Sequence, residues 1–146
     1  MKTKDIELYF NHFFEKENLD KNKKYLLAVS GGVDSMVLLN LFQVFDFNFS
    51  VCSCNFLLRS GESDEDILLV KTVCDKNKIK FYKKSFETKS FSKENNISIQ
   101  MGSRELRYEW FNELLKKNKY DFIVTAHHRD DNIETILFNF IKTTGY

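Results

Sequence analysis

Hydrophobic and polar positions follow two different periods along the chain, and together they predict alternating helices and strands. Apolar residues at helical spacing predict three helices, over Ile6–Glu17, Ser35–Phe45 and Ser103–Asn118. Short apolar or alternating runs predict four strands, over Tyr25–Val29, Phe47–Cys54, Lys80–Phe86 and Phe122–Ala126. The remaining segments are less regular, and for them we expect a loop over Leu57–Glu62, a helix from Ser63 to Asn77, a loop or weak helix over Glu87–Asn96, and a last helix over Asn132–Lys142. Ser63 and Asp66 are spaced as a capping box at the start of the second of these segments.

This order of elements indicates an α/β fold, a Rossmann-like doubly wound parallel sheet with right-handed crossovers. Sheets of this kind bind ligands beyond the carboxyl ends of their strands, at the point where the strand order reverses. Two polar segments follow the first and fourth predicted strands, at Ser30–Ser35 and Thr125–Asp131. We therefore expect both segments to face one crevice.

Composition narrows the class of protein. A chain of 146 residues suits one domain, and a formal net charge of +1 gives no general basic field for nucleic acid. An RNA partner would therefore be bound by a local patch or by another domain. No apolar run approaches the ~20 residues of a membrane helix, so no membrane partner is expected. Three cysteines make an odd count, which argues against a disulfide framework and favours a cytoplasmic location. Cys52 and Cys54 share one face of a strand, where core packing explains them better than a metal site.

The first candidate site is the turn that follows Tyr25–Val29. Ser30, Gly31 and Gly32 form a turn without side-chain bulk, and a helix starts near Asp34 and Ser35. Backbone N–H groups at such a turn can approach an anion closely, and the helix dipole stabilises its charge. The lysine of the usual P-loop is missing. The alternative is a structural turn in which Asp34 or Ser35 only caps the helix.

The second candidate site follows Phe122–Ala126 and contains His127, His128, Asp130, Asp131 and Glu134. These side chains can bind Mg²⁺ through carboxylates, hold an ammonium group, or position a proton acceptor. Asp131 and Glu134 also fit a capping pair, which leaves the two histidines unexplained. Zinc is disfavoured, because adjacent histidines diverge on a strand and no H-x-x-x-H spacing occurs.

The strand–SGGVDS–helix arrangement resembles the PP-loop, or N-type, ATP pyrophosphatases. These enzymes cleave ATP to AMP and pyrophosphate and activate an oxygen of a second substrate by adenylation. The resemblance implies that ATP phosphates are held by Ser30, Gly31, Gly32, Val33, Asp34 and Ser35, with Asp34 near Mg²⁺.

Three further segments resemble the tRNA(Ile)-lysidine synthases within that group. AHHRDDNIET at Ala126–Thr135 is similar to their (Q/H)HxDDxxET motif, Asn55–Asp64 to N-x-x-LRG-x-ES-D, and Ser103–Tyr108 to AREx-RY. The resemblance implies an enzyme that adenylates C2 of the wobble cytidine in an isoleucine tRNA with a CAU anticodon. Free L-lysine then displaces AMP and gives lysidine.

Carried over residue by residue, the resemblance implies a catalytic set of Asp34, Asp130, Asp131 and Glu134. Asp131 and Glu134 would hold lysine, and Asp130 would lie near Mg²⁺ or the reacting centre. Arg104 and Arg107 would face the nucleotide or the tRNA; alternatively they are a solvated face paired with Glu105 and Glu109. Further candidates for substrate contact are Asn55, Arg59, His127 and His128.

The chain departs from the family pattern in two places. Ser53–Leu57 lacks the histidines that family members commonly carry there, and Ser60 stands where glycine is usual. We expect residues 1–146 to be the ATP-binding catalytic domain, truncated at the C-terminus, without the tRNA-binding domains of the family; a homodimer is a candidate assembly. Two alternatives stay open. A tRNA 2-thiolation enzyme would need a C-x-x-C pair, which Cys52 and Cys54 do not form, and a non-catalytic nucleotide-binding module would have no use for the second site.

Overall fold

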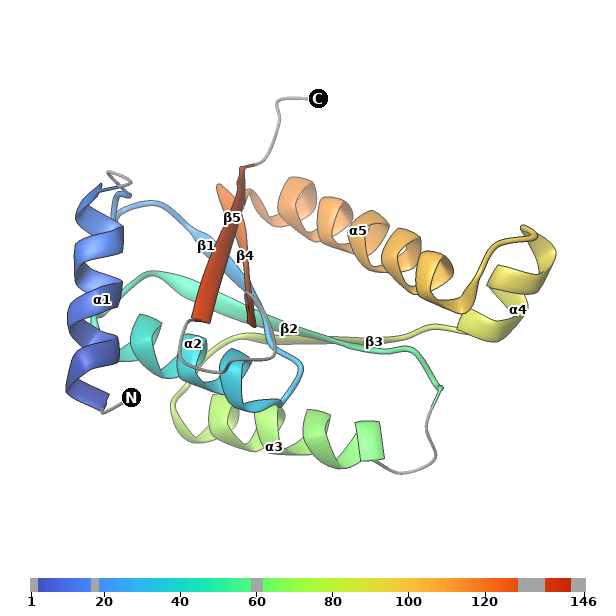
Figure 1. The fold of residues 1–146 in the computed structure, drawn as a ribbon, viewed down its shortest axis with the longest axis horizontal. Helices are drawn as coiled ribbons and strands as arrows, with labels where there is room; N and C mark the ends of the chain where they lie inside the picture. Colours follow the sequence, from blue (N-terminus) through green and yellow to red (C-terminus); the bar gives the residue numbers. More distant parts are fainter. Residues whose placement is uncertain (1–2, 17–18, 59–61, 129–135, 143–146) are drawn as a thin grey trace.

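The computed structural model describes residues 3–16, 19–58, 62–128 and 136–142. The helices are α1 (Thr3–Lys16), α2 (Val33–Val44), α3 (Glu62–Lys76), α4 (Thr88–Glu94) and α5 (Ile99–Asn118). The strands are β1 (Tyr25–Ala28), β2 (Phe49–Asn55), β3 (Phe81–Ser85), β4 (Phe122–His128) and β5 (Ile136–Lys142). They form one sheet in the order β3-β2-β1-β4-β5, in which the first four strands of that order run parallel (Figure 1).

Helices cover both faces of the sheet, because successive side chains of a strand point to opposite faces. Leu27, Val51 and Val124 pack with residues of α1, α2 and α3 in one buried cluster. Their neighbours Leu26, Cys52 and Ile123 pack with α5 in the other. The ribbon shows the same division, with α2 and α3 on one side of the sheet and α5 on the other (Figure 1). The predicted doubly wound α/β class is confirmed.

Most predicted elements are confirmed, with shifted ends. Helix α5 begins at Ile99 and not at Ser103, since the Ser98 Oγ accepts a hydrogen bond from the Met101 N–H at 3.1 Å and makes Ser98 the N-cap. The ambiguous segment after β3 contains the short helix α4. Helix α3 begins at Glu62, which places Ser63 inside the first turn. The predicted N-cap at Ser63 is therefore wrong.

The last predicted helix, over Asn132–Lys142, is also wrong. Its residues 136–142 form β5, which pairs antiparallel with β4 in a register that sets Phe140 against Val124 and Phe138 against Ala126. Ile136, Phe138 and Phe140 alternate along this segment, and β-branched and aromatic residues favour a pleated strand. Pairing with β4 gives the backbone its hydrogen-bond partners. The sheet is therefore mixed, and not parallel throughout.

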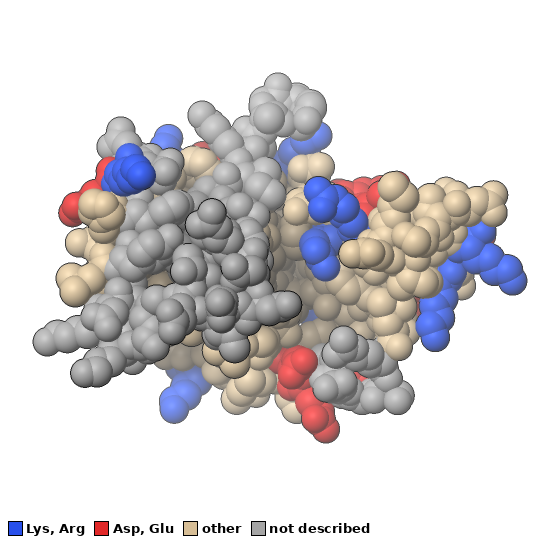
Figure 2. All heavy atoms as spheres, viewed as in Figure 1, with Lys and Arg blue, Asp and Glu red and all other residues tan. Residues whose placement is uncertain are grey.

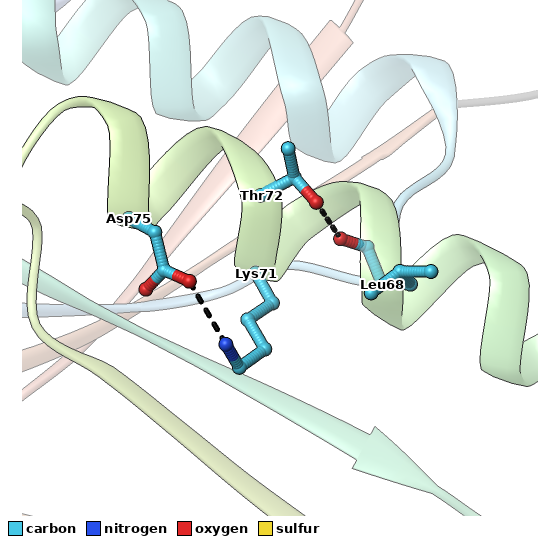
Figure 3. Close-up of polar contacts among 4 residues, drawn as sticks. All are labelled: Leu68, Lys71, Thr72 and Asp75. Atoms are coloured by element: carbon cyan, nitrogen blue, oxygen red, sulfur yellow. Dashed lines mark hydrogen bonds and ion pairs between the residues drawn. The ribbon is translucent and has the colours of Figure 1, made fainter.

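The outer face of α3 shows ordinary helix-surface contacts (Figure 3). Lys71 and Asp75 form an i,i+4 ion pair at 2.8 Å, and the Thr72 hydroxyl donates to the Leu68 carbonyl at 2.7 Å. Both charged side chains are more than half exposed, so the pair adds at most about 0.5 kcal/mol to stability. Over the ranges that the structure describes, every helix is too short or too polar to cross a membrane.

Candidate active site

The turn between β1 and α2 is closed by one hydroxyl group. The Ser35 Oγ accepts hydrogen bonds from the N–H groups of Ser30, at 3.1 Å, and Gly31, at 3.2 Å. The same hydroxyl donates to the Gly32 carbonyl at 3.0 Å. The Ser30 Oγ in turn accepts from the Gly32 N–H at 3.2 Å. Both serines of SGGVDS therefore shape the turn, in addition to any contact that they make with a ligand.

The two glycines of the turn have different roles. Gly31 has a φ of +94°, and a Cβ atom there would lie 2.7 Å from the Asp66 carbonyl oxygen of α3. Gly32 has a φ of −72° and is the N-cap of α2 without a side-chain cap. A Cβ atom at Gly32 would meet only the Ser30 Oγ, at 3.4 Å. Gly31 is thus required by the backbone and by α3, whereas Gly32 keeps the start of α2 open to a ligand.

The turn lines two adjoining cavities at the carboxyl ends of the strands. A cavity of about 170 Å³ is bounded by Gly32, Val33 and Asp34 on one side and by Ala126 of β4 on the other. A second, of about 240 Å³, reaches from Ser30 and Ser35 to Thr125, Ala126 and Arg107. We call the two together the crevice. It lies between β1 and β4, where the strand order reverses. The prediction that Ser30–Ser35 and Thr125–Asp131 face one crevice is confirmed for Thr125 and Ala126, and residues 129–131 lie outside the described residues.

Polar residues of β2 hold the neighbouring loop and helix in position. The Ser53 hydroxyl donates to the Val29 carbonyl at 2.6 Å. The Asn55 side chain is 3% exposed, donates to Asp64 of α3 at 2.8 Å and accepts from the Leu57 N–H at 3.0 Å. Asn55 therefore fixes the start of the loop after β2 to α3, and its substrate contact stays a prediction. The role of Asp64 as its partner was missed from the sequence, because it depends on how α3 packs.

Arg104 and Arg107 lie on the same side of α5 and both contact aromatic rings. The Arg104 guanidinium lies 5.3 Å from the centre of the Tyr108 ring, and that of Arg107 lies 5.2 Å from the centre of the Phe56 ring. Arg107 is half-buried and reaches the crevice, whereas Arg104 is exposed. Both arginines line a further cavity beside the crevice, and their contact with a nucleotide or tRNA stays a prediction.

The cysteines belong to the core. Cys52 is fully buried on the side of the sheet that faces α5, and Cys54 lies partly buried on the same side. Burial raises the pKa of Cys54 to about 12, although the positive charges of Arg107 and Lys84 oppose the rise. Burial also raises the pKa of Cys52 well above its ordinary value. Both are neutral thiols near pH 7, which suits packing and not metal binding or nucleophilic attack.

The second predicted site is described only in part. His127 and His128 belong to β4 by their backbone, while Arg59, Asp130, Asp131 and Glu134 lie outside the described residues. Within the described residues, no three His, Cys, Asp or Glu side chains are grouped to hold a metal ion. Mg²⁺ usually takes one or two carboxylates together with substrate phosphates. Asp34, which borders the cavity of about 170 Å³ beside the turn, fits that role.

The fold and this crevice define an α/β protein with a glycine-containing turn, and no P-loop lysine, at the point where the strand order of its sheet reverses. A family model described as the PP-loop domain matches residues 2–146. The chain belongs to the PP-loop domain family.

Two curated relatives of this chain share one name. The chain is 40% identical over 134 residues to the tRNA(Ile)-lysidine synthase of Bacteroides thetaiotaomicron. The aligned residues make up 91% of this chain and 32% of that protein. It is 44% identical over 124 residues to the enzyme of the same name from Chlorobaculum tepidum, covering 82% of this chain and 38% of that protein. The chain thus spans about a third of the length of these relatives.

A solved structure supports the fold. The NH3-dependent NAD synthetase of Campylobacter jejuni, in complex with a nitrate ion, superposes with a TM-score of 0.63 over 84% of this chain and 56% of that chain. The two sequences are 16% identical, so this likeness shows the fold alone.

Proposed function

We propose that this chain carries the reaction centre of an enzyme that joins free lysine to C2 of the wobble cytidine of tRNA(Ile) with a CAU anticodon. The observation that carries the proposal is the crevice at the switch point, where the Ser30–Ser35 turn, Thr125 and Arg107 meet. Similarity to curated tRNA(Ile)-lysidine synthases over most of the chain supports the choice of substrates.

In the first step, the O2 atom of the cytidine attacks the α-phosphorus of ATP and pyrophosphate leaves. The Ser30–Ser35 turn binds the phosphates through N–H groups at the start of α2, where Gly32 leaves room for them. Asp34 would hold Mg²⁺, which supplies positive charge against the phosphates when bound. Arg107, at the far side of the crevice, would stabilise the negative charge of the phosphate that joins the base to AMP.

In the second step, the ε-amine of lysine forms a bond to C2 and AMP leaves with the oxygen. The amine must first lose a proton, so a base near the site is required. We assign the binding of the lysine cation to Asp131 and Glu134, and the base or metal contact to Asp130. His127 and His128 continue β4 toward this segment and are further candidates for substrate contact. The carboxylates suit a cation, whereas Arg104 and Arg107 would repel it.

The cysteines argue against the alternative function, a tRNA 2-thiolation enzyme. Sulfur transfer needs a reactive thiolate, while Cys52 and Cys54 are packed against the α5 side of the sheet with raised pKa values. A nucleotide-binding module without catalysis remains the competing function, and it differs in one observable product, lysine attached to tRNA.

Lysine transfer to tRNA tests the proposal. The protein is incubated with ATP, radiolabelled lysine and a CAU-anticodon isoleucine tRNA transcript, and label in the tRNA is counted. Asp131→Asn should abolish transfer while ATP binding and the thermal midpoint stay unchanged. Asp75→Asn is the matched control, because Asp75 is an exposed residue of α3 in a weak ion pair. If Asp131→Asn lowers the thermal midpoint and Asp75→Asn does not, Asp131 has a structural role and its assignment to lysine is wrong.

A further inference from the structure

A larger cavity lies beside the crevice. Its volume is about 890 Å³, and its walls come from the loop after β2 and the first turns of α5. We call this space the outer cavity. Its lining includes Phe56, Leu58, Ile99, Met101, Arg104 and Arg107. Phe56 and Arg107 line both the outer cavity and the crevice, so the two spaces adjoin. The space-filling view shows Lys and Arg side chains on the surface over α5 (Figure 2).

The walls combine positive charge with exposed apolar surface. Arg104 and Arg107 supply two guanidinium groups, and none of the described residues that line the outer cavity is acidic. Leu58, Ile99 and Met101 are 37%, 39% and 52% exposed, which is unusual for three large apolar side chains around one cavity. The Arg107 guanidinium already lies over the Phe56 ring. This lining disfavours a cation such as lysine and favours an anion that carries a flat apolar group.

The phosphates of ATP, as the proposed function places them, do not account for the whole lining. The Ser30–Ser35 turn and the crevice provide for these phosphates, and Arg107 is the arginine that reaches that space. Arg104 lines only the outer cavity. A second anionic, partly aromatic group therefore fits beside the first, and Arg107 is placed to contact both.

We propose that the outer cavity binds an unpaired nucleotide of the RNA substrate, the chain neighbour of the nucleotide that reacts in the crevice. Its base packs on Phe56, Leu58 and Met101, and its phosphate is held by Arg104 and Arg107. Proteins recognise single-stranded RNA in this manner, with splayed bases on aromatic rings or guanidinium planes and phosphates on basic side chains. This inference rests on the proposed function, because it presumes an RNA substrate.

Variants of the two arginines test the assignment. Arg104→Ala should raise the Kd for tRNA about tenfold, reduce the salt slope of binding by about one, and leave the Kd for ATP within twofold. Arg107→Ala should weaken both ATP and tRNA, because Arg107 lines both spaces. Lys117→Ala is the matched control, an exposed basic residue near the other end of α5, and should change neither constant. If Arg104→Ala weakens ATP as much as tRNA, the outer cavity belongs to ATP and the proposal is overturned.

A second experiment changes the RNA as well as the protein. Transcripts with an abasic site immediately 5′ or 3′ of the reacting cytidine are bound to the protein and to a Leu58→Ser/Met101→Ser variant. One of the two abasic sites should raise the Kd for the wild-type protein about tenfold and the Kd for the variant by less than threefold, because the variant has already lost the apolar contact. Equal increases for both proteins, or no increase at either position, overturn the proposal. These binding constants are measured without lysine, so failed lysine transfer would contradict the proposed function and leave this test intact.

Discussion

Replacing Gly31 by alanine should destabilise the protein by about 2–4 kcal/mol. The backbone at Gly31 has a φ of +94°, where a residue with a Cβ atom pays about 1–3 kcal/mol of strain. The new methyl group would also lie 2.7 Å from the Asp66 carbonyl oxygen and 2.8 Å from the Asp66 Cβ, so α3 or the turn must shift. Because domains of this size have about 5–15 kcal/mol of stability in total, the loss is easily measured.

Gly32→Ala is the matched control on the neighbouring residue. Gly32 has an ordinary φ of −72°, and its new methyl group would meet only the Ser30 Oγ at 3.4 Å. We expect a change below about 1 kcal/mol in the free energy of unfolding. ATP binding should nevertheless weaken in Gly32→Ala, because the methyl group enters the space at the start of α2.

Urea denaturation followed by circular dichroism measures the first quantity, and isothermal titration with ATP measures the second. The reasoning predicts a large loss of stability for Gly31→Ala and a selective loss of ATP affinity for Gly32→Ala. If Gly31→Ala unfolds at the wild-type urea concentration, the close approach of the turn to α3 is wrong. If Gly32→Ala binds ATP normally, the phosphates lie elsewhere.

Three further outcomes are expected. Ser35→Ala removes the hydroxyl that closes the turn. The affinity for ATP, measured by titration calorimetry, should fall about tenfold, and the free energy of unfolding should fall by about 1–2 kcal/mol. An unchanged affinity would mean that Ser35 neither shapes the turn nor contacts phosphate. Cys54 has a pKa of about 12, so at pH 8 its reaction with iodoacetamide should be at least about a hundredfold slower in the native protein than in the urea-unfolded protein. Mass spectrometry follows the reaction, and comparable rates would show an exposed thiolate. The folded protein keeps the protons of Cys54, and of Cys74 with a pKa of about 11, at pH values where the unfolded chain loses them, so the free energy of unfolding should fall as pH rises from about 9 toward 12. A stability that stays constant or rises over that range would contradict the burial of these thiols.

The sequence was sufficient where local signals agree with one another. β1 is a short apolar run, and Ser30 and Gly31 follow in the turn after it. Both the apolar run and the turn residues predict a strand that leads into a helix. The placement of Cys52 and Cys54 on one face followed from the period of a strand alone. These features need no knowledge of distant contacts.

The start of α5 shows why other features could not be predicted. Ile99 and Met101 are apolar, but they line the outer cavity and are not packed in the core. The buried stripe of the helix therefore becomes clear only further along, from Leu106, and the hydrophobic pattern predicts a late start. Ser98 and Ser103 are equally acceptable caps by residue type, and only the hydrogen bond to Ser98 decides between them.

Pairing between distant segments decided the remaining cases. The apolar residues of Ile136–Lys142 fit a helix or a strand, and the edge of β4 selects the strand. Asn55 was predicted as a substrate contact, whereas the hydrogen bond that its side-chain amide donates to Asp64 depends on the packing of α3. Of the predicted catalytic residues, Asp34 lies in the crevice, and the carboxylates that follow β4 remain predictions.

The most direct test of the central claim is the stoichiometry of a single reaction. The protein is incubated with ATP, lysine and the CAU-anticodon isoleucine tRNA, and the AMP, pyrophosphate and lysine-modified cytidine are quantified together by chromatography and mass spectrometry. The account predicts one AMP and one pyrophosphate for each lysine attached to the wobble cytidine, with no product when the tRNA carries uridine at that position. ATP binding without lysine-modified cytidine would contradict it.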